Sequence, residues 1–284
     1  MIARRGPDFA AMIARLYGHL SRHCRAGGRW LTAALAGLGV ACAAPVPRIE
    51  RTDAELTVAV ARWDAPSGCR LTYRHYLPVG PPRGQALLAP GWLRAAHHLD
   101  GLARALARAG ITAVMLDWCR AGAWCGRAVR EAQDMVALAR ALGPAPTVYL
   151  GHSAGGLRAV LAADLDPRAR GAVTLDLVDR QGLGWRVART LAPPLLGMAG
   201  APSRCNANAN GATVFTFAPR ARLYTISTAR HCDFETPSDG WCAALCPPPP
   251  GHNEHENRAR IVTAAVAAVV ALLTQHLEHW PPPE

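Results

Sequence analysis

Short apolar runs alternate with helix-forming segments along most of this chain. We expect helices over residues 97–109, 126–142, 154–163 and 258–276, and strands over residues 86–90, 111–116, 147–150, 172–177, 194–199 and 221–227. Residues 56–62 and 69–77 are expected to form an antiparallel hairpin before them. This alternation predicts an α/β domain with a mostly parallel sheet of about eight strands, flanked by helices on both faces.

The composition is that of a globular protein with an excess of arginine. The chain of 284 residues is 50% hydrophobic and 18% charged. A formal net charge of +11 is a feature of proteins that bind nucleic acid or anionic membranes. All basic residues are Arg, however, and those beyond residue 44 are scattered and not interleaved with aromatic residues. We therefore expect no nucleic-acid partner.

The first 44 residues have the pattern of an export signal. Residues 12–29 are basic, residues 30–40 form a short apolar run, and small residues surround Cys42 just before Pro45. This pattern is typical of a secretory signal, and the apolar run is too short to span a bilayer comfortably. We expect a signal segment over residues 1–44 and a single domain over residues 45–284. Translation from Met12 would give a signal of more usual length.

The same region resembles a bacterial lipobox. In Gly39-Val-Ala-Cys42, Cys42 would carry the lipid that attaches the chain to a membrane. Leu38 stands one place earlier than the usual Leu, and cleavage after Ala43 by the ordinary signal peptidase is the alternative. Either route predicts an exported protein, periplasmic or secreted. A cytosolic protein with an apolar N-terminus is the remaining alternative.

Cysteine usage agrees with export, because seven Cys follow the signal segment and disulfides persist in oxidising compartments. Spacing does not fix their connectivity, and the candidate pairs are Cys119/Cys125, Cys242/Cys246 and Cys205/Cys232, with Cys69 left over. Zinc is the other explanation for clustered Cys, but the chain has no C-x-x-C pair. We therefore expect disulfides and no metal.

The motif richest in chemical information is Gly151-His152-Ser153-Ala154-Gly155. It follows an expected strand and precedes an expected helix, which is the context of a nucleophile elbow. In such a turn the serine sits in strained backbone, and its Oγ projects at the carboxyl edge of the sheet above a helix N-terminus. Ser153 is therefore the candidate nucleophile, and a Gly-rich turn without chemistry is the alternative.

A serine nucleophile needs a histidine base and an acid that orients the base, in the chain order Ser, acid, His. Asp176, at the end of the expected strand 172–177, is the preferred acid, and Asp179 is the alternative acid. His231 follows the expected strand 221–227 and is the candidate base. Four other histidines fit this role less well, because they begin a helix or lie in a polar loop: His97, His98, His252 and His255. His152 is adjacent to Ser153, so its side chain is expected to point away from the Oγ.

The oxyanion of an acyl-transfer intermediate needs two backbone N–H donors. Ala154, the residue after the nucleophile, is expected to supply one of them. The other is expected from the loop after strand 86–90, where Trp92 is the candidate and its indole would wall an acyl pocket. Residues 181–185 and 205–217 are expected to cover the site as loops or short helices.

Over roughly residues 84–275 these features resemble the α/β-hydrolase superfamily. The closer resemblance is to its chlorophyllase, dienelactone hydrolase and platelet-activating-factor acetylhydrolase-like branch. It rests on Ala89-Pro-Gly-Trp92, Gly151-His-Ser-Ala-Gly-Gly156, Val173-Thr-Leu-Asp-Leu-Val-Asp179 and Ala229-Arg-His-Cys-Asp233. It implies an α/β-hydrolase fold and a serine hydrolase that cleaves small-molecule carboxylic esters with a Ser153, Asp176 and His231 triad and no cofactor.

Two segments depart from the family pattern. The Cys-rich stretch Cys232–Cys246 is more than that pattern supplies. Many members have His-Gly at the oxyanion loop, where this chain has Pro90-Gly91, so the resemblance does not extend to the geometry of the second donor. Two alternatives to ester hydrolysis stay open from the sequence. One is a catalytically silent binding protein on the same fold. The other is an acyltransferase, which would pass the acyl group to an alcohol or an amine.

Overall fold

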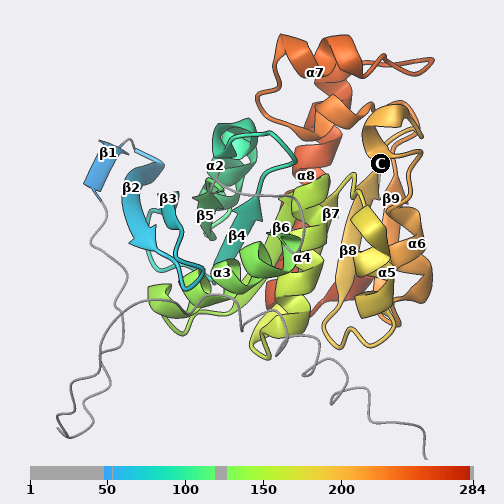
Figure 1. Cartoon of the computed structure of the whole chain (residues 1–284). Coiled ribbons are helices and arrows are strands. Elements are labelled where there is room, and N and C mark those ends of the chain that lie inside the picture. Colours follow the sequence, from blue (N-terminus) through green and yellow to red (C-terminus); the bar gives the residue numbers. More distant parts are fainter. Residues whose placement is uncertain (1–47, 53, 119–126, 282–284) are drawn as a thin grey trace, which may run out of the picture. The chain divides into compact units, whose positions relative to one another are not determined.

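The computed structural model describes residues 48–52, 54–118 and 127–281, and all of them belong to one folded unit, Ala41–Glu284 (Figure 1). The predicted signal segment, with Cys42, lies outside the described residues, as does the predicted pair Cys119/Cys125.

Within the described ranges the strands form one mixed sheet of nine strands in the order β1-β2-β3-β5-β4-β6-β7-β8-β9. Their bounds are β1 Arg48–Thr52, β2 Leu56–Asp64, β3 Arg70–Pro78, β4 Gln85–Ala89, β5 Thr112–Leu116, β6 Thr147–His152, β7 Ala169–Leu175, β8 Leu195–Ala199 and β9 Ala221–Thr225. The pairs β1–β2, β2–β3 and β3–β5 are antiparallel, and every pair from β5 to β9 is parallel. The predicted mostly parallel sheet is confirmed, with an additional edge strand, β1.

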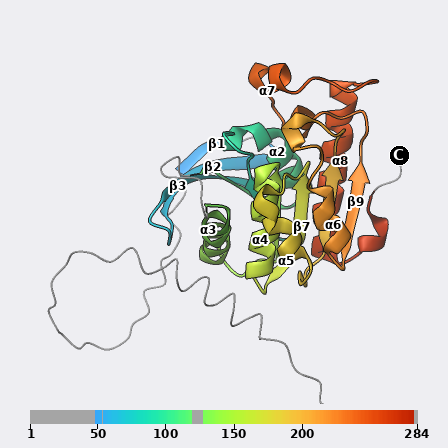
Figure 2. The same ribbon diagram turned by 45° about the vertical axis from the view of Figure 1, so that its right-hand side comes forward.

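Helices cover both faces of this sheet (Figure 2). Helices α2 (Asp100–Arg108) and α8 (Glu254–Thr274) pack on one face. The other face carries α3 (Arg127–Leu142), α4 (Ala154–Leu165), α5 (Leu183–Ala188) and α6 (Ala212–Phe217). The described residues also form α7 (Gly240–Leu245) and the short 3₁₀ helices η1 (Ala96–Leu99), η2 (Arg180–Gly182), η3 (Arg204–Asn206), η4 (His231–Phe234) and η5 (Leu277–His279).

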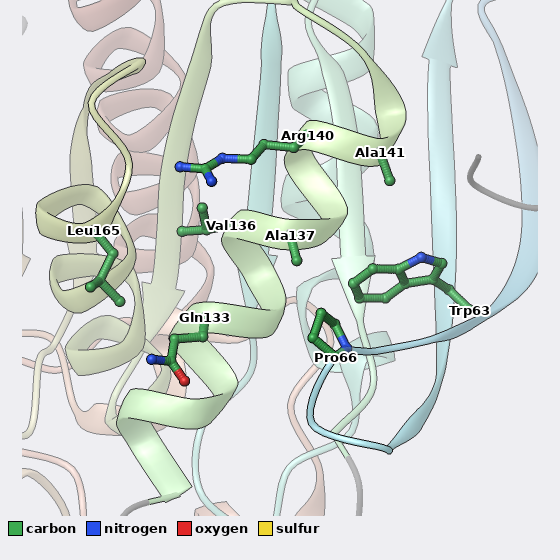
Figure 3. Close-up of a pocket in the computed structure, with 8 residues that line it drawn as sticks. All are labelled: Trp63, Pro66, Gln133, Val136, Ala137, Arg140, Ala141 and Leu165. Atoms are coloured by element: carbon green, nitrogen blue, oxygen red, sulfur yellow. The ribbon is translucent and has the colours of Figure 1, made fainter. Parts of the chain in front are cut away.

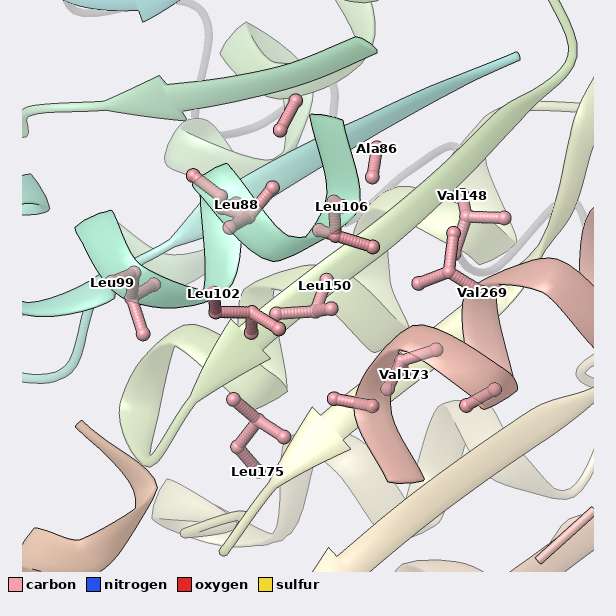
Figure 4. Packing of buried hydrophobic residues seen from close by; sticks show 14 of the residues in the cluster. Ala86, Leu88, Leu99, Leu102, Leu106, Val148, Leu150, Val173, Leu175 and Val269 are labelled. Carbon is pink, nitrogen blue, oxygen red and sulfur yellow. The ribbon is translucent and has the colours of Figure 1, made fainter. Parts of the chain in front are cut away.

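The central strands are buried on both sides because successive side chains point to opposite faces. In β6, Val148 and Leu150 pack toward α2 and α8, whereas Tyr149 packs toward α3 and α4. Figure 4 shows the first of these clusters, in which Leu102 of α2 and Val269 of α8 lie over β4, β6 and β7. The core thus holds the parallel strands rigidly, and their carboxyl ends share one edge.

Helix α8 is long and apolar enough to cross a membrane by length and composition alone, with a mean hydropathy of 1.4 over its most apolar window. Its contacts point to another role, because Ala265, Ala268 and Val269 are fully buried against the sheet. It begins at Glu254, four residues earlier than expected, where the Asn253 side chain accepts a hydrogen bond from the Glu256 N–H. We therefore interpret α8 as a core helix.

Candidate active site

Ser153 lies in a sharp turn between β6, which ends at His152, and α4, which begins at Ala154. Its backbone angles are φ 55° and ψ −123°, a conformation that L-residues rarely adopt. The turn is held by the Ser153 N–H, which donates to the Leu175 carbonyl at 2.8 Å, and by the Ser153 carbonyl, which accepts from the Gly156 N–H at 2.9 Å. The strained turn anticipated from the motif is therefore present.

Two glycines permit this turn. A Cβ on Gly151 would overlap the carbonyl group of Gly155 at the start of α4. A Cβ on Gly155 would overlap the carbonyl of Ala89 at the end of β4. The glycines therefore let the turn, the helix and the neighbouring strand approach one another more closely than any side chain would allow.

His231 and Asp176 are hydrogen-bonded although 55 residues separate them. The His231 Nδ1 lies 2.6 Å from the Asp176 Oδ2, and both residues are buried. Because an ionised carboxylate only accepts, Nδ1 carries the proton, which leaves Nε2 free to accept one. This is the arrangement that a general base needs.

Asp176 is held in place by several donors. It directly follows β7 with φ 45°, and its carboxylate accepts from the Gly200 N–H at 3.0 Å and from the Asn206 Nδ2 at 3.1 and 3.2 Å. These bonds fix the carboxylate toward His231. The sequence did not point to Gly200 or Asn206, because neither belongs to a motif and only the tertiary fold brings them to Asp176.

Asp179, the alternative acid, has different partners. Its carboxylate accepts from the Gly184 N–H at 2.7 Å and from the Trp185 N–H at 3.0 Å, at the start of α5. Its own N–H donates to Asn210. Asp179 thus anchors a helix N-terminus, and His231 is not among these hydrogen-bond partners.

The elbow and the His231 loop lie against each other. The imidazole rings of His152 and His231 are 4.5 Å apart between centroids, and His152 Nε2 lies 3.2 Å from the His231 carbonyl. The Ser153 N–H bonds to Leu175, the residue just before Asp176. The structure therefore brings Ser153, Asp176 and His231 to one place at the carboxyl edge of the sheet.

His152 is almost fully buried beside His231. Burial, together with the neighbouring His231, lowers the pKa of His152 well below its ordinary value of 6.5. A neutral His152 adds no positive charge next to His231.

The loop after β4 approaches the elbow closely. A Cβ on Gly91 would lie 3.3 Å from the Ser153 Cβ and 3.2 Å from the His152 Nδ1. Trp92 follows in the same loop, and its side chain is 52% exposed. Ala154 is the first residue of α4, so its N–H belongs to the unsatisfied first turn of that helix. Ala154 thus follows Ser153 directly, and Gly91, which precedes Trp92, lies against Ser153. The role of the two N–H groups as oxyanion donors remains a prediction.

The remaining candidate histidines have other partners or lie at the surface. His98 Nδ1 lies 3.0 Å from the Pro237 carbonyl, and His252 Nε2 lies 3.0 Å from the Asp233 carboxylate. His97 and His255 are exposed.

The predicted pairs Cys242/Cys246 and Cys205/Cys232 are wrong. The disulfides are Cys205–Cys246 and Cys232–Cys242, and Cys69 is disulfide-bonded as well. Proximity in sequence misled the prediction: the Cys242 and Cys246 sulfurs lie 3.9 Å apart, but each is bonded to a cysteine farther away along the chain. The sulfurs of Cys232, Cys242 and Cys246 lie within 4.8 Å of one another, but in this oxidised state each is already bonded to another sulfur.

A hollow of about 530 Å³ on the described part of the chain lies away from this site. It is lined by α3 and the β2–β3 turn, with Arg140, Trp63 and Leu165 among its side chains (Figure 3). Leu165 is the last residue of α4, whereas Ser153 precedes the first, so the length of this helix, roughly 18 Å, separates them. The hollow is therefore not part of the candidate active site.

No family model matches the sequence, and no curated protein matches it significantly. Solved structures do match. The esterase domain of a Rhodothermus marinus protein is 17% identical with a TM-score of 0.56, and the alignment covers 76% of this chain and 98% of that one. A predicted CIB-like hydrolase from Thermoplasma acidophilum is 16% identical with a TM-score of 0.54, covering 64% and 93%.

A cold-adapted esterase from an Arctic intertidal metagenomic library is 18% identical with a TM-score of 0.51, covering 66% of this chain and 92% of that one. At such identities the likeness concerns the fold. Together with the sheet order and the strained turn at Ser153, it shows that this chain has the α/β-hydrolase fold.

Proposed function

We propose that this chain is a serine hydrolase that cleaves carboxylic esters, with Ser153 as nucleophile, His231 as base and Asp176 as the acid that orients the base. The proposal rests chiefly on the hydrogen bond between Asp176 and His231 beside the strained turn that carries Ser153. The solved structures described as esterases share the fold and add support. The finer resemblance to the chlorophyllase, dienelactone hydrolase and platelet-activating-factor acetylhydrolase-like branch is part of the same proposal.

The proposed reaction has two acyl-transfer steps. His231 Nε2 takes the Ser153 hydroxyl proton as the Oγ attacks the ester carbonyl, and the resulting oxyanion accepts hydrogen bonds from the Trp92 and Ala154 N–H groups. His231 returns the proton to the leaving alkoxide, which departs as an alcohol and leaves an acyl group on Ser153. Water, deprotonated by His231, then attacks the acyl carbonyl. The bond to the Ser153 Oγ breaks, His231 returns the proton to that oxygen, and the carboxylic acid leaves. Asp176 stabilises the imidazolium in both steps.

The test is the Ser153→Ala variant on an activated short-chain ester such as p-nitrophenyl acetate. We expect kcat to fall by at least about a thousandfold, because the covalent route is lost. Ser67→Ala is the matched control: it also removes one hydroxyl, which here donates to Asp134 at 2.6 Å in the β2–β3 turn, away from the elbow. Full turnover by the Ser153 variant would overturn the proposal, whereas loss in both variants would point to unfolding.

We also propose that residues 1–44 direct export and that residues 45–284 are the catalytic domain. The two disulfides among the described residues support this, because such bonds persist outside the cytosol. Mass spectrometry of the mature protein tests it. A chain that begins at Ala44, or at a lipidated Cys42, is the expected result, and a mature chain that retains its first 40 residues would refute export.

A further inference from the structure

The oxyanion loop and the loop that carries His231 are joined by one buried ion pair, Arg94–Glu235. The Arg94 Nε donates to the Glu235 Oε1 and the Arg94 Nη2 to the Glu235 Oε2, each at 2.6 Å. This two-pronged contact spans 141 residues of sequence. The Glu235 side chain is 1% exposed and that of Arg94 is 16% exposed. Such a planar, paired geometry fixes both side chains more tightly than a single bond does.

Arg94 is bonded directly into the turn that contains Trp92. Its N–H donates to the Gly91 carbonyl at 3.2 Å, and Leu93 between them adopts φ 57°. Gly91 in turn packs on Ser153 and on the Arg94 Cγ. The position of the Trp92 N–H therefore depends on where the Arg94 side chain is held.

Glu235 closes the other loop. It directly follows η4, which begins at His231, and its N–H donates to the Cys232 carbonyl at 3.3 Å. Its Oε1 lies 3.5 Å from the Nδ1 of His152, whose other ring nitrogen contacts the His231 carbonyl. The Glu235 carboxylate, which accepts the hydrogen bonds of Arg94, thus belongs to the same segment as His231, the proposed base.

Arg94 also contacts Asp239, the N-cap of α7. Arg94 Nη1 donates to its Oδ2 at 2.9 Å, and the Cys242 N–H donates to its Oδ1 at 3.0 Å. These two hydrogen bonds lower the pKa of Asp239 to about 2, and the bond from Arg94 has the larger effect. Arg94 therefore holds two carboxylates, one buried and one at the surface.

We propose that Arg94 is a positioning residue that keeps the oxyanion donor of Trp92 in register with His231 through Glu235. The inference rests on the proposed serine-hydrolase function. An oxyanion donor works only within a few tenths of an ångström of its position, and a displacement of about 1 Å costs on the order of a hundredfold in rate. A buried ion pair, in contrast, contributes little net stability relative to an apolar pair of similar volume. A large loss of kcat with little loss of stability would therefore indicate a positioning role, and a loss of stability alone would indicate a structural one.

The experiment compares Arg94→Lys, Glu235→Gln and the double variant Arg94→Met/Glu235→Leu with the wild type on p-nitrophenyl acetate, at a temperature well below every Tm. We expect kcat to fall about 10- to 100-fold in Glu235→Gln and in the double variant, with KM changed less than about threefold. Arg94→Lys keeps the charge but not the paired geometry, so it is expected to retain part of the activity. A boronic acid that forms a tetrahedral adduct on Ser153 should bind more weakly by the same factor as the loss of kcat/KM.

The control is Asp166→Asn, which neutralises another buried carboxylate at the far end of α4, bonded to the Tyr149 hydroxyl at 2.8 Å. It should lower Tm and leave kcat and boronic acid affinity unchanged. A folded double variant with wild-type kcat and wild-type affinity would overturn the positioning role while the proposed function stands. A wild-type protein that hydrolyses no ester would overturn the proposed function itself, and the positioning role with it.

Discussion

Asp176 and Asp179 lie three residues apart, and their surroundings differ completely. Asp176 contacts His231, whereas Asp179 anchors the start of α5. Asp176→Asn should therefore lower kcat about 10⁴-fold, because the amide no longer selects the required His231 tautomer. Asp179→Asn should leave kcat within about threefold and lower Tm, because two backbone N–H groups lose a charged acceptor.

Steady-state kinetics of the two variants on p-nitrophenyl acetate, with Tm measured alongside, check this prediction. The reverse order of kcat losses would identify Asp179 as the acid. It would also mean that the hydrogen bond between Asp176 and His231 is not the one used in catalysis.

His152 carries a prediction about pH. Burial lowers its pKa well below 6.5, so below pH 6.5 the unfolded chain takes up a proton that the folded chain does not. The free energy of unfolding should therefore fall as the pH drops below 6.5, by up to about 1.4 kcal/mol per pH unit from this residue. In His152→Gln that contribution disappears, and the dependence between pH 6.5 and 5 should be shallower.

Urea unfolding at several pH values, with the disulfides intact, measures the difference between the two proteins. His75 adds a dependence of its own, because burial lowers its pKa to about 4, but it does so equally in both proteins. Parallel curves for wild type and variant would show that His152 titrates normally in the folded state.

At the residue scale, the sequence predicted those features of the site that depend on local patterns and on chain order. The alternation of strand and helix around Ser153 identified the strained turn, and chain order pointed to Asp176 and His231. It did not point to Arg94 and Glu235, because their contact depends on two loops that meet only after the sheet has formed.

Among the elements, the disulfides Cys205–Cys246 and Cys232–Cys242 tie α7 to the loops of the site. Cys232 follows His231 directly, and Cys205 precedes Asn206, which donates to Asp176. Cys205–Cys246 closes a loop between residues that are 41 positions apart, whereas Cys232–Cys242 closes a loop between residues that are 10 positions apart. Loop-closure entropy therefore predicts that removing the first pair costs about 1 kcal/mol more than removing the second.

The double variants Cys205→Ser/Cys246→Ser and Cys232→Ser/Cys242→Ser measure this difference by urea unfolding. Equal losses, or a larger loss from the shorter bridge, would contradict the entropic account. They would then indicate that packing around α7 dominates its contribution to stability.

The elements that sequence patterns missed are those with little apolar signal. All five residues of β1 are exposed and mostly polar, so no alternation marks the strand. Helix α7 has only six residues and none of them is buried, and its Cys residues favoured the interpretation as a loop. The core elements, in contrast, were predictable because burial on both faces demands apolar runs of characteristic length.

For the molecule as a whole, the parallel order of β5, β4, β6, β7, β8 and β9 gathers the candidate site at one edge. The loops after β4, β6, β7 and β9 supply Trp92, Ser153, Asp176 and His231 in turn. No single loop contains the chemistry, so the site exists only when the sheet is folded.

The most direct test of this account is covalent labelling of the folded protein with a fluorophosphonate, followed by peptide mass mapping. We expect one modified residue, Ser153, with labelling abolished in Ser153→Ala and greatly slowed in Asp176→Asn and His231→Ala, because the reagent needs an activated serine hydroxyl. Failure of the wild-type protein to be labelled, or labelling that persists in Ser153→Ala, would contradict the assignment of Ser153 as the nucleophile.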